Sequence, residues 1–370
     1  MNTLTSVANN LLDSAWYDEL SLLSEMAWAT RQYLISEVNQ AGRMLVNPLA
    51  TPAELDHALT VINNWRSCHS YPLNILQNGL RQRAKQADPN RLIAQRIKRI
   101  ASIKLKLSQQ KTMRLTQMQD IGGCRAIVGS VAQVEKLVDL YKRSDLKHER
   151  GPEDNYISNP RASGYRGIHL IYRYFSDRIE TWNELQIEVQ LRTKLQHAWA
   201  TTVETIGMLR EEALKSSLGN PEWMRFFALM GSVHAIRERR PIVRGTPGSE
   251  KDLLRELRDL TKRLNVMDTL NTYATVLGVP QHPTLREASY FLMKLQPTQN
   301  RVQVTGFRSN QLQEATQQYL ATERTIVGNT GEQAVLVSVD SLKNLRRAYP
   351  NYFLDARVFT DSLHQVLAKK

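Results

Sequence analysis

Three short segments with strand-like patterns constrain the fold of this chain more than any other feature. Residues 124–128 are apolar and bounded by glycines, and residues 167–174 and 185–192 alternate, so that polar side chains share one face of each strand. A predicted helix at 131–143 separates the first two strands, and another predicted helix follows from Thr193. The pattern predicts an α+β fold in which a mixed β-sheet is flanked by helices.

The rest of the chain divides into regions of different pattern. Residues 1–80 show apolar residues at helical spacing and predict an N-terminal helical region, and 81–245 would hold the sheet. A stretch rich in glycine and proline then indicates a boundary, so that 246–285 are predicted as linking helices and 286–370 as a small α/β domain. Within that domain we predict strands at 291–296, 302–307 and 333–339, and helices at 309–324, 341–348 and 358–368. We predict a long loop over 150–166.

Composition excludes several classes of protein. Hydrophobic residues make up 42% of the 370 residues and charged residues 23%, which is typical of a globular chain. Two cysteines, Cys68 and Cys124, are too few for a disulfide scaffold or a cysteine-rich zinc module. The sequence has neither a long apolar run nor a signal peptide, so we expect a cytoplasmic protein without a membrane partner.

The chain is strongly basic, and much of the excess charge lies in one segment. Lysine and arginine number 49 against 36 acidic residues, which gives a net charge of +13. Residues 81–114 hold eleven basic residues and one acidic residue, which indicates a partner that carries phosphate. A helix face that is merely solvated would mix both signs. Within 96–107 a helical pattern places an apolar stripe opposite Lys98 and Lys106, so that these lysines can point into a cleft.

Two carboxylates are predicted to converge beside these cations. Asp120 lies just before the strand at 124–128, and Glu188 projects from the polar face of 185–192. Carboxylates from neighbouring strands can share Mg²⁺, which bridges phosphate oxygens. Transfer of a phosphoryl-type group depends on positioning and charge neutralisation, so the pattern favours that chemistry. Each carboxylate also has a simpler interpretation, because Asp120 can cap a turn and Glu188 can pair with Arg192.

Four ordered motifs resemble the RelA/SpoT nucleotidyltransferase domain. They read RIKRIASIKLKL (96–107), DIGGCRAIV (120–128), YISNPRASGYRGIHL (156–170) and EVQLRTKLQHAWA (188–200). The resemblance covers about residues 90–210. It implies a nucleotidyltransferase core that transfers the β,γ-pyrophosphate of ATP to a ribose 3′-hydroxyl and releases AMP, with Mg²⁺ as cofactor.

The resemblance also implies roles for individual residues. The donor ATP would contact Arg96, Lys98, Lys104, Lys106 and Arg125, with the two arginines on either side of the adenine. Asp120 would bind Mg²⁺, and Glu188 would bind the metal or activate the acceptor hydroxyl. The acceptor would contact Tyr156, Arg161, Tyr165, His169, Gln190 and Arg192, with the tyrosine at 165 stacked on its base. Taken alone, Tyr165 also fits the simpler interpretation of a packing aromatic, and His169 that of a satisfied core histidine.

The acceptor side departs most from the family pattern. Arg161 stands where many members have lysine, and Gly167 stands where serine follows in them. Arginine keeps the charge of lysine but presents its donors in a different geometry. The sequence also lacks the His-Asp doublet of the family's hydrolase domain, and it has no P-loop.

The C-terminal region resembles the tail of the CapRel-type fused toxin–antitoxin branch. The stretch VLVSVDSLKNLRRAYPNYFLD (335–355) carries a Tyr-x-x-Tyr motif at Tyr349 and Tyr352. In that branch the C-terminal domain folds back over the ATP site until a phage structural protein binds it. That tail has no cysteine ligands, and neither does this one, so no zinc is expected. The alternative interpretation of the motif is a helix stop with buried aromatic residues.

Three functional hypotheses follow. The first is an ATP-dependent pyrophosphokinase that modifies the 3′-CCA adenosine of tRNA, inhibits translation and is autoinhibited by its C-terminal domain. The second is an alarmone synthetase that makes (p)ppGpp or (p)ppApp from GDP, GTP or adenine nucleotides. The third is a catalytically inactive module that binds RNA or senses phage. The first makes tRNA the expected partner, and the sequence leaves the oligomeric state open, with a monomer allowed.

Overall fold

The computed structural model describes residues 28–209, 219–273, 287–296, 301–326, 332–339, 342–353 and 356–368, together with Leu285 and Gln299. The helical positions predicted before residue 28 lie outside these described residues. Among the described helices, none combines the length and the apolar character needed to cross a membrane.

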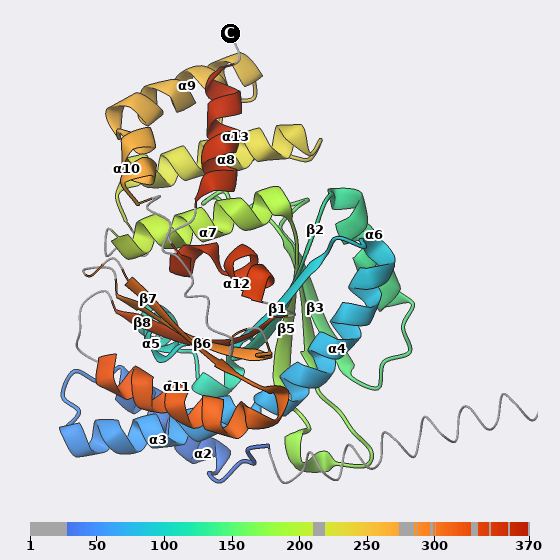
Figure 1. Cartoon of the computed structure of the whole chain (residues 1–370), viewed down its shortest axis with the longest axis vertical. Helices are drawn as coiled ribbons and strands as arrows, with labels where there is room; N and C mark the ends of the chain where they lie inside the picture. The colour runs from blue at the N-terminus through green and yellow to red at the C-terminus, as the bar shows by residue number, and fades with distance from the viewer. Residues whose placement is uncertain are drawn as a thin grey trace, which may run out of the picture.

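A mixed β-sheet organises the described residues (Figure 1). Its eight strands lie in the order β3-β4-β5-β2-β1-β8-β6-β7. They are β1 (Leu92–Ile97), β2 (Gly122–Val128), β3 (Glu149–Asn155), β4 (Ile168–Arg173), β5 (Gln186–Thr193), β6 (Tyr290–Gln296), β7 (Arg301–Phe307) and β8 (Gln333–Val339). β2 and β5 are parallel, and the other neighbouring pairs are antiparallel. The predicted α+β fold with a mixed, helix-flanked sheet is therefore confirmed.

The strand register aligns the candidate site residues in two rows across the sheet. One row consists of Ala94, Arg125, Gln190 and His169. The adjacent row consists of Arg96, Gly123, Glu188 and Ile171. Side chains of residues paired in register, and of residues two apart on one strand, project to the same face of a sheet. One face of β1, β2, β5 and β4 therefore carries the charged residues.

The opposite face of these strands is apolar and covered by helices. Cys124, Ala126 and Val128 alternate with the residues of the charged face and are almost fully buried. They share one core with α4 (Ser70–Ala87) and α6 (Val131–Lys142). The other helices of this half are α2 (Ile35–Leu45), α3 (Pro52–Cys68) and α5 (Ile100–Gln109). This apolar layer holds the strands in place, so that the charged face does not need to supply the core.

A second core lies above the charged face. The helices α7 (Lys194–Leu209), α8 (Pro221–Arg237), α9 (Glu250–Arg263), α10 (Val266–Tyr273) and α13 (Arg357–Leu367) build it. The rings of Phe226 and Phe227 lie 6.2 and 6.0 Å from that of Phe359, so α13 is tied to α8 by aromatic packing. Ser249 caps α9, and its hydroxyl accepts from the backbone N–H of Asp252.

The C-terminal strands extend the same sheet. β8 pairs with β1 over three residues, Ala94–Val339, Gln95–Ser338 and Arg96–Val337. Helix α11 (Leu312–Ile326) packs on β6 and β8, and α12 (Leu342–Ala348) contacts β1 and leads into a short helix at Pro350–Phe353. Figure 1 shows α12 beneath α7, beside the sheet. We call β6, β7, β8, α11 and α12, together with Tyr349 directly after α12, the C-terminal unit.

Two sequence-based expectations about the local structure were wrong. The helix predicted over 96–107 starts only at Ile100, because Leu92–Ile97 form β1. β1 pairs with β2 on one edge and β8 on the other, and this long-range pairing overrides the local helical pattern. The first part of the loop predicted over 150–166 is a strand instead, because residues 150–155 belong to β3, which pairs with β4 through a register shift between Arg150 and Glu153.

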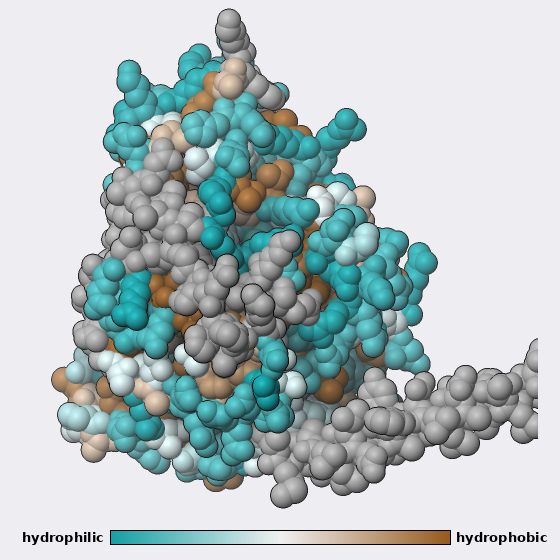
Figure 2. Space-filling model, in the orientation of Figure 1, coloured by the Kyte–Doolittle hydropathy of each residue, from teal (hydrophilic) through white to brown (hydrophobic). Residues whose placement is uncertain are grey.

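The surface agrees with the basic, polar composition. Figure 2 shows a mostly hydrophilic surface on the viewed face, with hydrophobic residues in scattered small patches. Among the residues that the structure describes, the exposed large hydrophobic side chains are those of Leu34, Ile35, Leu49, Leu105, Phe175 and Val358. Single exposed residues of this kind are normal in soluble folds.

Candidate active site

Asp120 lies at the entry to β2 between two lysines. Its Oδ2 atom is 2.5 Å from Lys98 Nζ, and its Oδ1 atom is 2.9 Å from Lys106 Nζ. Burial alone would raise the pKa of this carboxyl, but Lys98 and Lys106 outweigh both burial and the nearby Glu188 and hold the pKa below its ordinary value. The interpretation of Asp120 as a mere turn cap is wrong for its side chain, which binds cations.

Lys98 is held by the backbone as well as by Asp120. It lies between β1 and α5, where its backbone N–H donates to the carbonyl of Ile121 over 2.8 Å. Lys106 reaches the same carboxylate from the second turn of α5. Lys104, two residues earlier on that helix, is exposed, because residues two apart lie on different faces of a helix. The structure thus brings Lys98 and Lys106 together and leaves Lys104 outside this group.

Glu188 is paired with His169 across two neighbouring strands. His169 Nδ1 lies 2.8 Å from Glu188 Oε1, and the Gln190 amide donates to the other carboxylate oxygen. Burial would raise the pKa of Glu188, but His169 and the bond from Gln190 hold it well below its ordinary value. Arg192, expected as an alternative partner of Glu188, instead donates to the Tyr165 hydroxyl over 2.6 Å.

His169 is therefore more basic than an ordinary histidine. Burial would lower the pKa of its imidazole, but the Tyr165 hydroxyl oxygen and the Glu188 carboxylate raise it to about 9. The Tyr165 hydroxyl meets the second ring nitrogen of His169. At neutral pH the cationic ring connects Glu188 to Tyr165, so His169 is neither an isolated core residue nor a free base.

Aromatic and guanidinium groups form a wall next to this pair. Tyr165 packs edge-on against Tyr156 and His169, with ring centroids 5.7 and 5.5 Å apart. The Arg161 guanidinium lies 4.3 Å above the Tyr156 ring and donates to its hydroxyl. The predicted acceptor residues Tyr156, Arg161, Tyr165, His169, Gln190 and Arg192 thus form one connected cluster.

A buried network missed by the sequence analysis fixes the end of this wall. Arg166 donates to Glu238 over 2.7 Å, and the same carboxylate accepts from Thr193 at the end of β5 and from Gln196 in the first turn of α7. Gly164 approaches α8 so closely that a β-carbon on Gly231 would lie 2.7 Å from the Gly164 carbonyl oxygen. Local patterns cannot reveal such contacts, because they join segments far apart in sequence.

Arg125 faces the C-terminal unit. Its guanidinium lies 4.7 Å from the centroid of the Tyr349 ring, and the Tyr349 hydroxyl donates to the Gln95 carbonyl over 2.7 Å. Tyr349 is 1% exposed and follows the end of α12, as the helix-stop interpretation also requires. The side chain of Tyr352, the second tyrosine of the motif, lies outside the described residues.

Asp120 and Glu188 fit a magnesium site. They are close enough for Glu188 to act on the pKa of Asp120, and both already hold cationic groups. Mg²⁺ typically takes one or two protein carboxylates and completes its shell with phosphate oxygens and water. No cluster of three or more histidine, cysteine or acidic side chains suited to a metal occurs within the described ranges.

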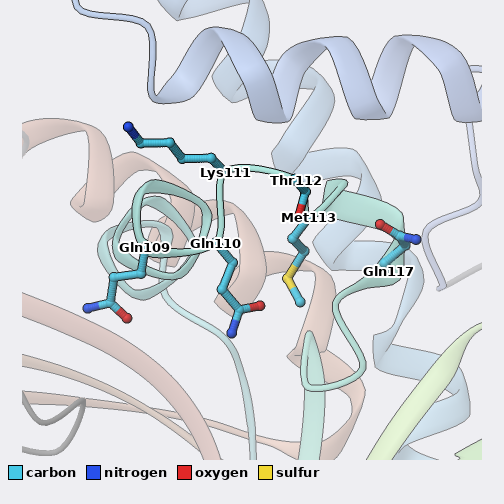
Figure 3. A pocket seen from close by; sticks show the side chains of 6 residues that line it. All are labelled: Gln109, Gln110, Lys111, Thr112, Met113 and Gln117. Carbon is cyan, nitrogen blue, oxygen red and sulfur yellow. The ribbon is translucent and has the colours of Figure 1, made fainter.

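A separate cavity of about 730 Å³ opens at the turn after α5. Figure 3 shows the side chains that line it, Gln109, Gln110, Lys111, Thr112, Met113 and Gln117. Neither Asp120 nor Glu188 lines this cavity, so we do not assign the chemistry to it.

Comparisons with known proteins agree with the location of this site. Residues 95–207 match the family model described as the region found in RelA / SpoT proteins, close to the range expected from the motifs. The GTP pyrophosphokinase YjbM of Bacillus subtilis (strain 168) is 30% identical over 117 residues, which are 30% of this chain and 54% of that protein. The probable chloroplastic GTP diphosphokinase RSH3 of Oryza sativa subsp. japonica is 31% identical over 96 residues, which are 25% of this chain and 12% of that protein.

The matched part of the chain spans about half the length of the Bacillus relative. Among solved structures, a GTP pyrophosphokinase family protein from Streptococcus pneumoniae is 25% identical, with a TM-score of 0.39, over 46% of this chain and 85% of that one.

Proposed function

We propose that this chain transfers pyrophosphate from ATP to a ribose 3′-hydroxyl. The observation that carries the proposal is the meeting of Asp120, Glu188 and two lysines on one face of the sheet. The names of the two relatives, a GTP pyrophosphokinase and a probable GTP diphosphokinase, support the same class of reaction. A catalytically inactive module would have no need of a buried and a half-buried carboxylate, side by side and both with lowered pKa values.

The residues divide the work of such a transfer. Asp120 and Glu188 are the residues that would hold Mg²⁺, which supplies charge neutralisation on the phosphates. Lys98 and Lys106 exchange Asp120 for the phosphate oxygens of ATP. The acceptor 3′-oxygen attacks the β-phosphorus, the bond from that phosphorus to the α,β-bridging oxygen breaks, and AMP leaves. Glu188 has two alternative roles in this transfer: its carboxylate binds the metal, or it accepts the proton of the acceptor hydroxyl.

We further propose that the C-terminal unit inhibits the enzyme in cis. Tyr349 lies against Arg125, the arginine that the resemblance assigns to the adenine. An aromatic ring and an adenine use the same face of a guanidinium, so they compete for it.

The proposed acceptor is the 3′ end of tRNA, and the proposed trigger of release is a phage structural protein. The charge of +13 supports a nucleic-acid acceptor. On the surface around α8, Arg239 and Arg244 are exposed, whereas Arg237 bonds Ser362 and Arg240 pairs with Glu135. If such arginines bind the phosphate backbone of tRNA, enzyme activity should fall steeply as the salt concentration rises. Synthesis of (p)ppGpp is the second candidate, favoured by the names of the relatives.

The test is a transfer assay with ATP labelled at the γ-phosphate. The full-length Tyr349→Ala variant is offered tRNA, tRNA with an oxidised 3′ end, GDP, GTP and ATP, and the labelled product is identified. Label on intact tRNA alone supports the first proposal, and label on GDP or GTP supports the alarmone synthetase. Absence of label on every acceptor, in a folded protein that binds ATP, contradicts both.

A further inference from the structure

A buried arginine joins the C-terminal unit to the lysine beside Asp120. Arg66 lies on α3 and is 1% exposed. Neighbouring protein groups, rather than water, must therefore stabilise its positive charge. Its Nε atom donates to the backbone carbonyl of Lys98 over 2.9 Å. Its terminal nitrogens donate to Glu323 and Tyr319 of α11, both over 2.6 Å. One guanidinium therefore contacts both the lysine segment and the C-terminal unit.

Glu323 completes this junction from the side of α11. One of its carboxylate oxygens accepts from Arg66, and the other accepts from the backbone N–H of Ile100, the first residue of α5, over 3.3 Å. Next to it, the Arg99 guanidinium donates to Gln333 on β8. Residues 98–100 connect β1 to α5 and include Lys98. They are thus bound to the C-terminal unit through Arg66, Glu323 and Gln333.

We infer that Arg66 is a positioning residue for Lys98. We also infer that Glu323 gives the C-terminal unit a second inhibitory contact with the site, on its phosphate side, and we call this contact the second lock. This lock is separate from the contact of Tyr349 with Arg125, which lies on the base side. A buried arginine that loses its carboxylate is strongly disfavoured, so movement of α11 must be accompanied by rearrangement around Arg66. The meaning of the lock for catalysis rests on the proposed function.

The coupling is tested by hydrogen exchange on the full-length protein. In Glu323→Gln, amides of α11 and of 98–109 should both exchange about tenfold faster, because the buried charge of Arg66 is left unpaired. Glu314→Gln, in the exposed first turn of α11, is the control for loss of a carboxylate on this helix; it weakens the bonds from Gln311 and Gln318 but should leave 98–109 unchanged. Tyr319→Phe, which removes one hydroxyl from Arg66, should show a smaller change in the same two segments.

The double variant Arg66→Gln/Glu323→Gln separates charge from packing. It removes both charges together, so protection of α11 should return towards that of the unaltered protein. The inference is overturned if Glu323→Gln loosens α11 while 98–109 stay unchanged, or if neither segment responds in Glu323→Gln and Tyr319→Phe. A purely structural contact would loosen α11 alone.

Kinetics distinguish the lock from the reaction itself. Glu323→Gln should raise kcat for pyrophosphate transfer at saturating ATP, whereas Tyr349→Ala should mainly lower KM for ATP. If Glu323→Gln leaves kcat unchanged in a protein that Tyr349→Ala does activate, the second lock is wrong. If no variant transfers pyrophosphate to any acceptor, the proposed function fails, and hydrogen exchange alone still decides whether Arg66 couples the two segments.

Discussion

Each carboxylate of the site is held by cations from other elements of the fold. Asp120 binds lysines from the β1–α5 connection and from α5, and Glu188 binds a histidine from the neighbouring strand. The alternation of 185–192 correctly predicted that Glu188 and Gln190 share a face. The choice of His169 over Arg192 as partner depends on the pairing of β4 with β5, which no local pattern contains.

Substitution of Glu188 tests the catalytic role at this scale. We expect Glu188→Gln to lower pyrophosphate transfer by about 10³-fold, since the amide accepts no proton and holds metal poorly. The same change should lower the pKa of His169 from about 9 towards its ordinary value, because the carboxylate that favours the cation is gone. An imidazole titration followed by NMR measures the pKa. Unaltered transfer by a folded Glu188→Gln protein would exclude the mechanism.

The same ion pair predicts how stability depends on pH. The pKa of His169 is raised in the folded state to about 9, above the ordinary value of about 6.5, so its contribution is complete below the ordinary value and is lost as pH rises through 9. Glu188 has a lowered pKa, so its contribution is lost only in acid. Melting temperatures of the protein and of His169→Gln should therefore converge between pH 6 and pH 10. A constant difference over that range would contradict the assignment.

At the scale of elements, helix α8 and the loop before β4 are in contact through two glycines. A β-carbon on Gly231 would lie 2.7 Å from the Gly164 carbonyl oxygen, and the φ of +97° at Gly164 is itself one that favours glycine. In Gly231→Ala the clash with backbone outweighs the gain of about 1 kcal/mol in helix propensity, so we expect a net loss of about 1–2 kcal/mol. Denaturant unfolding measures it.

The matched control is another helical glycine. A β-carbon on Gly79 in α4 would meet only the end of the Arg83 side chain, which can move. Gly79→Ala should therefore stabilise the protein slightly, by about 0.5–1 kcal/mol. Equal changes in the free energy of unfolding for the two substitutions would show that the close approach of Gly164 to α8 does not affect stability.

Prediction from sequence worked best for elements with a strong period. Strand 333–339 and the helix after Thr193 occur where they were predicted. β1 was missed because its polar residues continue the helical pattern of 96–107, and β3 was missed because Gly151 and Pro152 lie at its register shift. In both strands, pairing with distant partners decides the structure, and such pairing leaves no local signal.

For the whole molecule, the shared sheet and cores determine how inhibition can be tested. β8 pairs with β1, and Phe359 of α13 packs on Phe226 and Phe227. Deletion of the chain after α10 would uncover an edge of the catalytic sheet and an aromatic core, so loss of activity after truncation would only report damage. A single substitution at the contact with Arg125 avoids this problem.

Tyr349→Ala is that substitution. It removes the ring above Arg125 and the hydrogen bond to Gln95, contacts of together about 1–2 kcal/mol, so ATP affinity should rise about tenfold. Tyr349→Phe keeps the ring and loses only the hydroxyl, so the affinity for ATP should rise less in this variant.

Tyr349→Ala also leaves a cavity beside Leu345, so the melting temperature of this variant should fall while its nucleotide binding improves. Calorimetric titration with ATP and Mg²⁺ measures the affinity. If all three proteins bind ATP equally well, Tyr349 does not guard the base side of the site, because competition for Arg125 cannot leave affinity unchanged.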